Sequence, residues 1–481
     1  MVDSPMTQQR ERELKFDVPD GWELPNLASI VPAGGSVDRR SVSLDSTYYD
    51  TADHALRAAR VTLRRRTGDE DEGWQLKVPT GDARTEIGLP LGPRDVPAEL
   101  RQLTTGVRAG APVRPVARVR TERQGHAFLA PDGTPLAELA FDDVIATAMG
   151  GSATVTAWRE VEVELKAGDE ALLKRAAKAL RRAGAEPSAS GSKLARALGA
   201  TMSRAPSGAP RSVLDAVLPY LAEQHAAMVA ADLELRRDRD VVHVTRVACR
   251  RYRSALHVFD DLFDADRAAF LDGELKWYAG VLGAVRDLQV LGTQLRAELA
   301  DLPDELVLGP VSARLEQTLS HDLAAARSKL ASALAGRRYV ALLRELRAWA
   351  EQAPVVAKDK PAARLDKYLS KAERKLDRRI ELAAAVDDDA AGKNDALHRV
   401  RKAAKRARYT AELSAPALGK RAAGSAKRAK KLQTTLGHRQ DAVIAVEFLR
   451  RLGAVAGTTP GENGFTFGLL FARVARRGQE G

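Results

Sequence analysis

Residues 160–166 read Glu-Val-Glu-Val-Glu-Leu-Lys, and this stretch decides how the first part of the chain folds. Successive side chains of a strand point to opposite faces, so the glutamates and the lysine share one face and the apolar residues share the other. Similar runs recur upstream between turn clusters rich in Gly, Asp and Pro. The predicted strands span residues 11–18, 41–49, 61–66, 74–78, 116–123, 137–142 and 154–166. About eight antiparallel strands at this spacing predict a barrel or a sandwich.

Charged residues gather on one face of each predicted strand. The sets that share a face are Glu11 with Glu13 and Lys15, Arg64 with Arg66, Arg118 with Arg120, and Glu138 with Asp142. A solvated outer face explains any single strand. Rows of like charge in every strand, however, cost free energy unless something compensates them. The interior of a closed barrel is the alternative, in which carboxylates hold a divalent cation and Arg or Lys side chains bind phosphate oxygens.

The size and composition of the chain exclude several classes of protein. A chain of 481 residues is too long for one ordinary domain, and 44% hydrophobic with 29% charged residues is typical of a soluble globular protein. No apolar run approaches the roughly 18 residues of a membrane helix, and the polar start has no secretory segment. Cys249 is the only cysteine, which excludes an intrachain disulfide and a metal site made of several cysteines. We therefore expect a cytoplasmic protein without a membrane partner.

The chain changes character near residues 203–211. A helix is predicted over residues 170–183, the segment 203–211 is rich in Pro, Gly and Ser, and apolar residues recur at helical spacing from residue 212 onward. Residues 1–202 carry a net charge of −1, whereas residues 203–481 carry +13. This asymmetry indicates a polyanionic partner for the second part, whether nucleic acid, a membrane surface or polyphosphate.

Two segments of the helical part repeat each other. At the same four offsets, His243 is followed by Arg246, Arg250, Arg251 and Arg253, and His398 by Arg401, Lys405, Arg406 and Arg408. Later in each copy, Leu-Gly-Ala-Val-Arg-Asp (282–287) matches Leu-Gly-His-Arg-Gln-Asp (436–441). The sequence therefore contains a duplicated helical unit.

Most basic residues of each copy share a helix face. The histidine and the residues three, seven and ten positions after it lie within an arc of about 80°. A solvated basic face is the simplest explanation, but like charges at these spacings repel each other. A bound polyanion better explains such a row in both copies. The leading histidine of each copy either donates to a phosphate or is structural.

The first part of the sequence resembles the CYTH family, the triphosphate tunnel metalloenzymes. The resemblance begins with Glu-Arg-Glu-Leu-Lys (11–15) and extends to residue 198. Further motifs follow in order: Tyr-Tyr-Asp-Thr (48–51), Val-Thr-Leu-Arg-Arg-Arg (61–66), Trp-Gln-Leu-Lys-Val-Pro (74–79), Arg-Val-Arg-Thr-Glu-Arg (118–123), the stretch 160–166 and Ser-Lys (192–193). The resemblance implies an eight-stranded antiparallel barrel that hydrolyses triphosphate compounds with Mg²⁺ or Mn²⁺. The segment 81–86 departs from the family pattern, so Arg84 and Glu86 are weaker candidates for the site.

The same resemblance implies a role for individual residues of the barrel. The expected catalytic residues are Glu11, Glu13 and Lys15. The expected metal ligands are Glu11, Glu13, Glu160, Glu162 and Glu164. The residues expected to bind the triphosphate are Lys15, Arg64, Arg66, Lys77, Arg118, Arg120, Arg123 and Lys193.

The duplicated basic motif resembles the CHAD domain, the conserved-histidine α-helical domain, over residues 212–475. This resemblance implies two pseudo-symmetric helical bundles whose basic faces bind inorganic polyphosphate. The residues expected to bind it are His243, Arg246, Arg250, Arg251, Arg253, His398, Arg401, Lys402, Lys405, Arg406 and Arg408.

We therefore expect an α+β chain of two domains, residues 6–202 and 212–475, joined by a linker at 203–211. An eight-stranded antiparallel barrel would hydrolyse inorganic triphosphate or a related compound, and an all-α domain would bind polyphosphate, with the protein associated with polyphosphate granules in the cytoplasm. A non-catalytic polyphosphate scaffold, an adenylate cyclase and an RNA- or ribosome-binding protein are the alternatives. Nucleic acid is disfavoured because Tyr252 and Tyr409 are the only aromatic residues in the basic segments, whereas single-strand binders stack bases on aromatic platforms.

Overall fold

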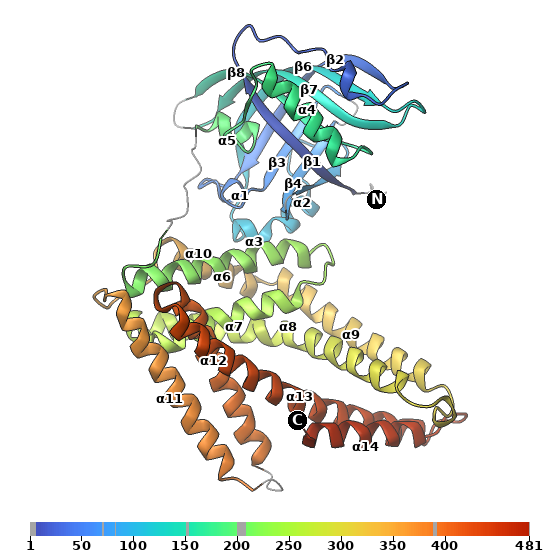
Figure 1. Ribbon diagram of the computed structural model, residues 1–481, viewed down its shortest axis with the longest axis vertical. Helices are drawn as coiled ribbons and strands as arrows, with labels where there is room; N and C mark the ends of the chain where they lie inside the picture. Colours follow the sequence, from blue (N-terminus) through green and yellow to red (C-terminus); the bar gives the residue numbers. More distant parts are fainter. Residues whose placement is uncertain are drawn as a thin grey trace. The chain divides into compact units, whose positions relative to one another are not determined.

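The computed structural model describes residues 6–69, 72–81, 83–150, 153–199, 208–387 and 392–480. The chain divides into two compact units, residues 1–205 and 206–481 (Figure 1). Of the expected linker, residues 203–207 lie outside the described residues.

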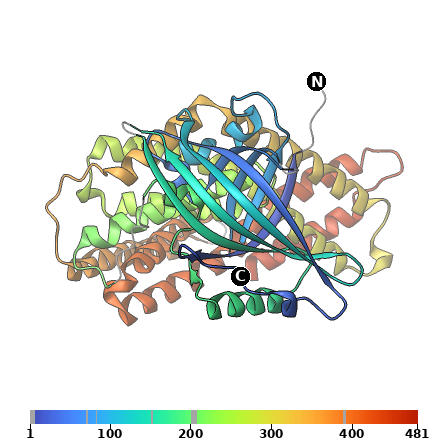
Figure 2. The ribbon, with the colours of Figure 1, turned by 90° about the horizontal axis from the view of Figure 1, so that it is seen from above.

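Eight antiparallel strands of the first unit close into a barrel. They are β1 (Thr7–Val18), β2 (Ser36–Asp50), β3 (Thr62–Thr67), β4 (Gly73–Thr80), β5 (Ala83–Leu89), β6 (Arg114–Leu129), β7 (Pro135–Ala148) and β8 (Thr154–Leu165). Their order is β5-β4-β3-β2-β6-β7-β8-β1, and pairing of β1 with β5, from Thr7 opposite Gly88 to Glu11 opposite Arg84, closes the sheet. Figure 2 shows the long strands lying side by side. The predicted fold class is confirmed.

Of the eight strands that close the barrel, β5 is the one that the sequence pattern did not locate. Its seven residues, Ala-Arg-Thr-Glu-Ile-Gly-Leu, contain a glycine and few of the β-branched and aromatic residues that favour strands. Strand β5 pairs with β4 on one side and with β1 on the other. These backbone pairings stabilise the strand although its residues have a low intrinsic preference for it. A two-residue strand, β9 (Glu186–Pro187), adds a further pairing to β1.

The barrel carries much of its apolar core on its outer face. Phe16 of β1 and Val163 of β8 pack against Leu172 and Leu180 of helix α4 (Glu170–Arg182). The side chain of Asp169 caps the start of this helix by accepting a hydrogen bond from the backbone N–H of Leu172. Because side chains alternate along a strand, the charged neighbours of these apolar residues point into the barrel. The interior, and not a solvated face, holds the charged rows of β1 and β8.

One end of the barrel interior is apolar and is filled by a short helix. Leu194 and Ala197 of α5 (Lys193–Ala197) pack against Val119, Val144 and Trp158 from the inner faces of β6, β7 and β8. On the same face of β8, Trp158 is followed by Glu160, Glu162 and Glu164. The polar cavity therefore begins where this apolar end stops. The short helices α1 (Ala55–Ala58), α2 (Ala98–Leu103) and α3 (Thr105–Arg108) lie in the connections between strands.

The second unit is helical, and its helices repeat in order. The first set is α6 (Val213–Leu235), α7 (Val242–Val258), α8 (Ala265–Ala300) and α9 (Val311–Ala335). After α10 (Arg337–Glu351) the second set follows as α11 (Leu365–Ala384), α12 (Lys393–Leu418), α13 (Lys420–Ala456) and α14 (Phe465–Glu480). In each set the third helix is the longest, with 36 residues in α8 and 37 in α13. The two sets of helices follow the duplication that the sequence predicts.

Each copy of the basic motif lies on the second helix of its set, 243–253 on α7 and 398–408 on α12, and these two helices contact each other. An apolar cluster from α8, α9, α13 and α14 joins the two sets, with Leu295 and Leu315 on one side and Phe448 and Leu470 on the other. Throughout the described residues, no helix has the length and apolar character needed to span a membrane.

Candidate functional site

A polar cavity of about 240 Å³ lies inside the barrel. Nine cationic and seven carboxylate side chains line it, together with Tyr48 and a few other polar residues. The cationic side chains are Lys15, Arg40, Arg64, Arg66, Lys77, Arg84, Arg123, Lys166 and Lys193. The carboxylates are Glu11, Glu13, Asp69, Glu86, Glu138, Glu162 and Glu164. Most of the residues that the sequence singled out in the barrel thus meet in one space.

Lys77 of β4 bridges two carboxylates at the wall of this cavity. Its Nζ lies 2.9 and 2.8 Å from the two carboxylate oxygens of Glu11 and 2.8 Å from Oε2 of Glu86. Burial raises the pKa of Glu11 to about 7, because Lys77 compensates the lost hydration only in part. Burial also opposes the charge of Glu86, but Lys77 and Arg64 outweigh it and lower the pKa of Glu86 to about 2. Of the two carboxylates that Lys77 bridges, Glu11 is therefore the one whose charged form is disfavoured on balance.

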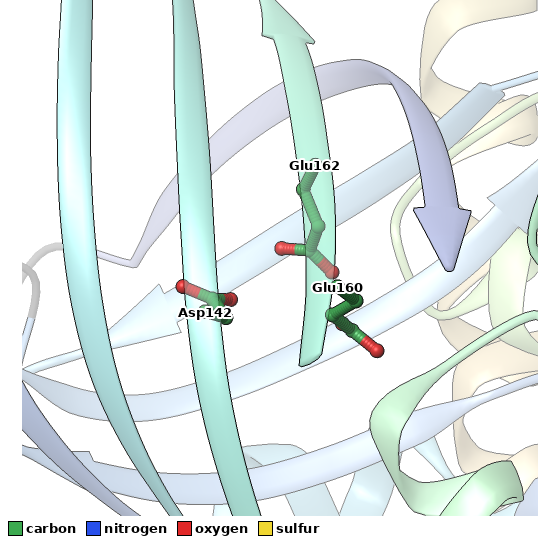
Figure 3. Close-up of side chains that lie close together, drawn as sticks. All are labelled: Asp142, Glu160 and Glu162. Carbon is green, nitrogen blue, oxygen red and sulfur yellow. The ribbon is translucent and has the colours of Figure 1, made fainter. Parts of the chain in front are cut away.

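Lys193, at the start of α5, is enclosed by carboxylates. Its Nζ lies 2.8 Å from Asp142 Oδ2, 2.7 Å from Glu160 Oε1 and 2.9 Å from Glu162 Oε1. Figure 3 shows the three carboxylates, Glu160 and Glu162 on β8 and Asp142 on the neighbouring strand β7. Although burial opposes the charge of Lys193, these carboxylates raise its pKa. The first effect of this arrangement is to attach α5 to the inner wall of the barrel.

Lys15 and Arg123 lie next to the same cluster. Lys15 forms ion pairs with Glu162 and, at 3.4 Å, with Glu13. Arg123 donates two hydrogen bonds of 2.8 Å to Asp142 and one of 3.2 Å to Glu162. The inner wall of β1, β6, β7 and β8 is therefore a continuous network of alternating charge.

The arginines of β3 form the opposite wall. Arg64 donates through Nε to Gln75 at 2.6 Å and through Nη1 to the Tyr48 hydroxyl at 3.3 Å. Arg64 and Arg66 are both buried, and burial opposes ionisation of Tyr48 while these two arginines and Lys193 outweigh it and lower its pKa. Two buried guanidinium groups next to a polar cavity make this wall suited to phosphate oxygens.

The structure corrects the expected places of Arg118 and Arg120. Both lie on the outer face of β6 as exposed side chains, where they form ion pairs with Asp45 of β2. The inward-facing residues of β6 are instead Val119, Thr121 and Arg123, because closure of the barrel turns this set of alternating positions inside. Arg118 and Arg120 therefore cannot reach a triphosphate in the cavity.

Glu160 is buried and is not among the residues that line the cavity. Trp158 Nε1 donates to it at 2.6 Å, and Lys193 forms an ion pair with it. Its expected role as a metal ligand stays a prediction. Conversely, Arg40, Asp69 and Glu138 line the cavity although the sequence did not assign them a role, and so do Arg84 and Glu86, which the sequence gave as weaker candidates. The alternation of Arg84 with Glu86 and the position of Glu138 on a charged face were the signals available for three of them.

Two groups of carboxylates qualify for a divalent cation. Oxygens of Asp142, Glu160 and Glu162 lie within 4.8 Å of one another, close enough to hold a metal ion, but Lys193 already occupies the space between them. The cavity-lining Glu11, Glu13 and Glu164 offer oxygen ligands of the kind that Mg²⁺ and Mn²⁺ prefer, on a surface that a phosphate can reach. The donor set of the cavity thus fits a hard divalent cation.

A second candidate site lies in the helical unit, where cations from both repeats converge. Lys405 of α12 is partly buried, and burial, followed by the charges of Arg401, Arg250 and Arg246, lowers its pKa to about 7. Burial also lowers the pKa of Arg401; Asp441 opposes this shift, whereas Arg250 and Arg246 add to it. The two α7 arginines and the two α12 cations therefore lie within electrostatic reach of one another. We call Arg246, Arg250, Arg401 and Lys405 the cationic cluster.

The cationic cluster retains unused hydrogen-bonding capacity. Within the described part of the chain, the buried Nε atoms of Arg250 and Arg401 have no hydrogen-bond partner, and neither Arg250 nor Lys405 forms an ion pair. Buried donors without partners are rare in folded proteins. Four neighbouring cations, two of them arginines whose Nε has no hydrogen-bond partner among the described residues, are the arrangement expected of an anion site.

The other basic residues of the repeat do not all join this cluster. Arg251 pairs with Glu412 at 2.8 Å, Arg408 with the same carboxylate at 2.7 Å, and Arg253 with Asp272 at 2.8 Å. Ion pairs thus occupy these three arginines, within α12 for Arg408 and between helices for Arg251 and Arg253.

The remaining residues of the motif lie around the edge. Arg406 is held partly buried near Arg253 and Asp272, and Lys402 is exposed. His243 and His398 are exposed at the start of their rows, and burial together with Arg286, Arg250 and Arg246 lowers the pKa of His243. Both histidines therefore border the cationic cluster.

Comparisons with known proteins support the division of the chain. A family model of the CYTH domain matches residues 9–198, and one of the CHAD domain matches residues 219–450. Uncharacterized protein Rv2226 of Mycobacterium tuberculosis is 36% identical to the chain over 485 residues, which cover 97% of this chain and 93% of that protein. The resemblances drawn from the sequence motifs are confirmed.

Two solved structures are similar to part of the chain. The CHAD domain of the plant Ricinus communis is 26% identical, with a TM-score of 0.46, and the match covers 57% of this chain and 91% of that one. The PH1819 protein from Pyrococcus horikoshii is 16% identical, with a TM-score of 0.24 and a match that covers 39% of this chain and 96% of that one.

Proposed function

This chain belongs to the proteins that join a CYTH domain to a CHAD domain, and we propose that its barrel hydrolyses inorganic triphosphate or a related triphosphate compound while its helical domain binds inorganic polyphosphate. Members of the CYTH superfamily are metal-dependent phosphoryl-transfer enzymes, and triphosphatases and cyclases are among them. The proposal narrows this class to one reaction and one partner.

The observation that carries the proposal is the mixed charge of the barrel cavity. Cations alone would suffice to bind a triphosphate, but seven carboxylates share the lining and would repel phosphate oxygens. A divalent cation between carboxylates and phosphates removes this repulsion, and Mg²⁺ and Mn²⁺ bind in this way through a few carboxylates and substrate phosphates. The cavity composition is therefore explained by a triphosphate bound together with a metal ion.

The residues of the cavity would act mainly by position and charge. Arg64 and Arg66, with Lys15 on the opposite wall, would bind phosphate oxygens and stabilise the charge that spreads over them during in-line transfer. Glu11 and Glu13 would hold the metal ion, and Glu164 would help to orient the attacking water. When bound, the ion would polarise the phosphoryl oxygens and neutralise the charge of the leaving group.

Phosphate release tests this half of the proposal. The full chain would be incubated with inorganic triphosphate, ATP or long polyphosphate, with Mg²⁺, with Mn²⁺ and with a chelator. We expect metal-dependent release of phosphate from inorganic triphosphate. Formation of cyclic AMP and pyrophosphate from ATP would instead establish a cyclase, and metal-independent binding without turnover of any compound would establish a scaffold.

The cationic cluster supports polyphosphate as the partner of the helical domain. Four cations at one place bind a chain of phosphates without reading bases, and the aromatic side chains of the basic segments, Tyr252 and Tyr409, are both buried. A nucleic-acid site for single strands would present aromatic surfaces for stacking. A cytoplasmic protein with such a site would associate with polyphosphate granules.

Replacing the whole cationic cluster tests this second half. In a chain with Arg246, Arg250, Arg401 and Lys405 all changed to Ala, affinity for polyphosphate should fall and its dependence on salt should flatten, because fewer counterions are released. Exposed Lys427 and Lys431, changed together to Ala, are the matched control on the surface of α13. Binding of RNA but not of long polyphosphate at physiological salt would refute the proposal for this domain.

A further inference from the structure

The Gly-to-Asp segment that both helical repeats share has no part in the sites described so far. Gly283 lies within α8 and Gly437 within α13, the longest helices of the second unit. Glycine is disfavoured relative to alanine inside a helix, because its backbone loses more conformational freedom on folding. A glycine at the same place in both copies therefore indicates that something occupies the space of its side chain.

An arginine guanidinium occupies that space in each copy. A Cβ atom added to Gly283 would lie 3.2 Å from Nη2 and 3.3 Å from Cζ of Arg246. A Cβ atom added to Gly437 would lie 3.3 Å from Nη2 of Arg401. Ordinary van der Waals contacts of a Cβ begin at about 3.4 Å, so both guanidinium groups lie against bare helix backbone.

Two other glycines of the same helices lie against open space. A Cβ atom added to Gly280 of α8 or to Gly424 of α13 would have no neighbouring atom within 4 Å. Gly292 of α8 also faces a guanidinium, with Nη1 of Arg296 3.0 Å from the added Cβ, but Arg296 belongs to the same helix and pairs with Glu316. Gly283 and Gly437 differ because each receives an arginine of the cationic cluster from another helix.

An aspartate four residues after each glycine completes the arrangement. Residues four apart lie on the same face of a helix, and Asp287 accepts a hydrogen bond of 2.6 Å from Nη1 of Arg246. In the second copy the charge of Asp441 acts on Arg401 and opposes the lowering of its pKa by burial. We call each glycine with its aspartate an arginine seat, formed by Gly283 with Asp287 and by Gly437 with Asp441.

We propose that the two arginine seats are positioning elements of the polyphosphate site, each of which fixes one arginine of the cationic cluster in the orientation that binds phosphate. The inference rests on the proposed binding of polyphosphate by the helical domain. A long arginine side chain that is already held loses less conformational freedom when it binds, and its planar donors are aligned in advance. The seats thus account for the second half of the duplicated motif.

Substitution of the seat glycines by alanine tests the proposal in the full chain. Gly283→Ala and Gly437→Ala would displace the end of a flexible side chain and leave the helix intact, so the unfolding temperature should not fall. Affinity for polyphosphate of defined length, measured with a chelator present to prevent turnover, should fall by about tenfold per seat, the effect of weakening one charge-assisted hydrogen bond. Gly280→Ala and Gly424→Ala are the matched controls and should bind as the unaltered chain does.

Combination with the arginine substitutions separates positioning from a merely structural role. If Gly283 acts through Arg246, then Gly283→Ala should cost no further affinity in a chain that already carries Arg246→Ala, and Gly437→Ala should behave likewise with Arg401→Ala. Equal losses with and without the arginine would overturn the proposal, as would unchanged affinity in both seat variants. If the unaltered chain itself does not bind polyphosphate, the proposed function of the helical domain is refuted. The proposal for the arginine seats is then refuted with it.

Discussion

In the proposed mechanism, different residues of the barrel hold the metal ion and bind phosphate, and Glu11 and Glu13 hold the metal ion. Changing both to Gln should abolish metal-dependent hydrolysis of triphosphate, because neutral amides bind hard cations far more weakly than carboxylates do. The fold should persist, since Lys77 keeps its ion pair with Glu86 at 2.8 Å. Phosphate release and circular dichroism measure the two effects.

A control for this double substitution is available on the outside of the barrel. Glu122→Gln changes an exposed carboxylate of β6 that accepts a hydrogen bond from Ser43, and it should leave hydrolysis unchanged. Full activity in a correctly folded Glu11→Gln, Glu13→Gln chain would rule out a mechanism inside the barrel.

The pKa of Lys405, lowered to about 7, gives polyphosphate binding a dependence on pH. Below this pKa the side chain is charged before binding, whereas above it the neutral amine must take up a proton as the polyanion binds. Affinity should therefore decline as pH rises, by up to about tenfold per unit above pH 7. Titration calorimetry in buffers of different ionisation enthalpy would register the uptake of the proton.

Lys405→Arg provides the comparison, because arginine stays charged over this range. The histidines at the start of each row contribute equally to both proteins, so the difference between the two pH profiles isolates Lys405. Parallel profiles would show that Lys405 does not titrate in the site.

At the scale of single elements, the ion pairs of Lys193 attach helix α5 to the barrel together with apolar contacts and the ion pair of Arg196 with Asp17. Lys193→Met would leave Asp142, Glu160 and Glu162 without the cation between them, and all four side chains are buried or nearly so. Removing one partner of a buried pair costs about 3–5 kcal/mol, so the free energy of unfolding of the barrel should fall by roughly this amount. Urea unfolding followed by the fluorescence of Trp158, which packs against α5, would measure it.

Two further variants test whether the loss of stability in Lys193→Met comes from the uncompensated carboxylates. Lys166→Met removes a partly exposed pair with Glu164 and should cost at most about 1 kcal/mol. Asp142→Asn combined with Lys193→Met should recover part of the stability, because one uncompensated charge is gone. Similar stability of Lys193→Met and the unaltered chain would mean that the apolar contacts and the Arg196 ion pair alone hold α5.

For the whole molecule, the two units each contain their own core and their own candidate site. The apolar cluster around Phe16 and Leu172 lies within the first unit, and the cluster around Leu295 and Phe448 lies within the second. We therefore expect residues 1–202 alone to hydrolyse triphosphate and residues 212–481 alone to bind polyphosphate, both at the level of the full chain. Turnover and binding of the purified fragments are the measurements. An inactive fragment of residues 1–202 that regains activity on addition of the second fragment would indicate one integrated site.

Much of this organisation follows from the sequence alone. Alternation in stretches such as 160–166 predicts strands with a charged face, because backbone geometry gives strands a period of two. The spacing of 155 residues between His243 and His398, with basic residues at the same offsets after each, is enough to reveal the duplication. These properties are local or periodic, and local backbone geometry is enough to interpret them.

Which face points inward is a property of the closed barrel and not of any strand. Arg64 with Arg66 and Arg118 with Arg120 look alike in the sequence, yet the first pair lines the cavity and Arg118 and Arg120 lie outside with Asp45. Periodicity states that two residues share a face, but only the pairing of eight strands decides which face is enclosed. In the helices, likewise, Arg253 reads as a member of the same row as Arg250, and only packing against α8 brings Asp272 to it. The choice between a ligand-binding and a structural cation depends on partners distant in the chain, and the tertiary structure alone supplies them.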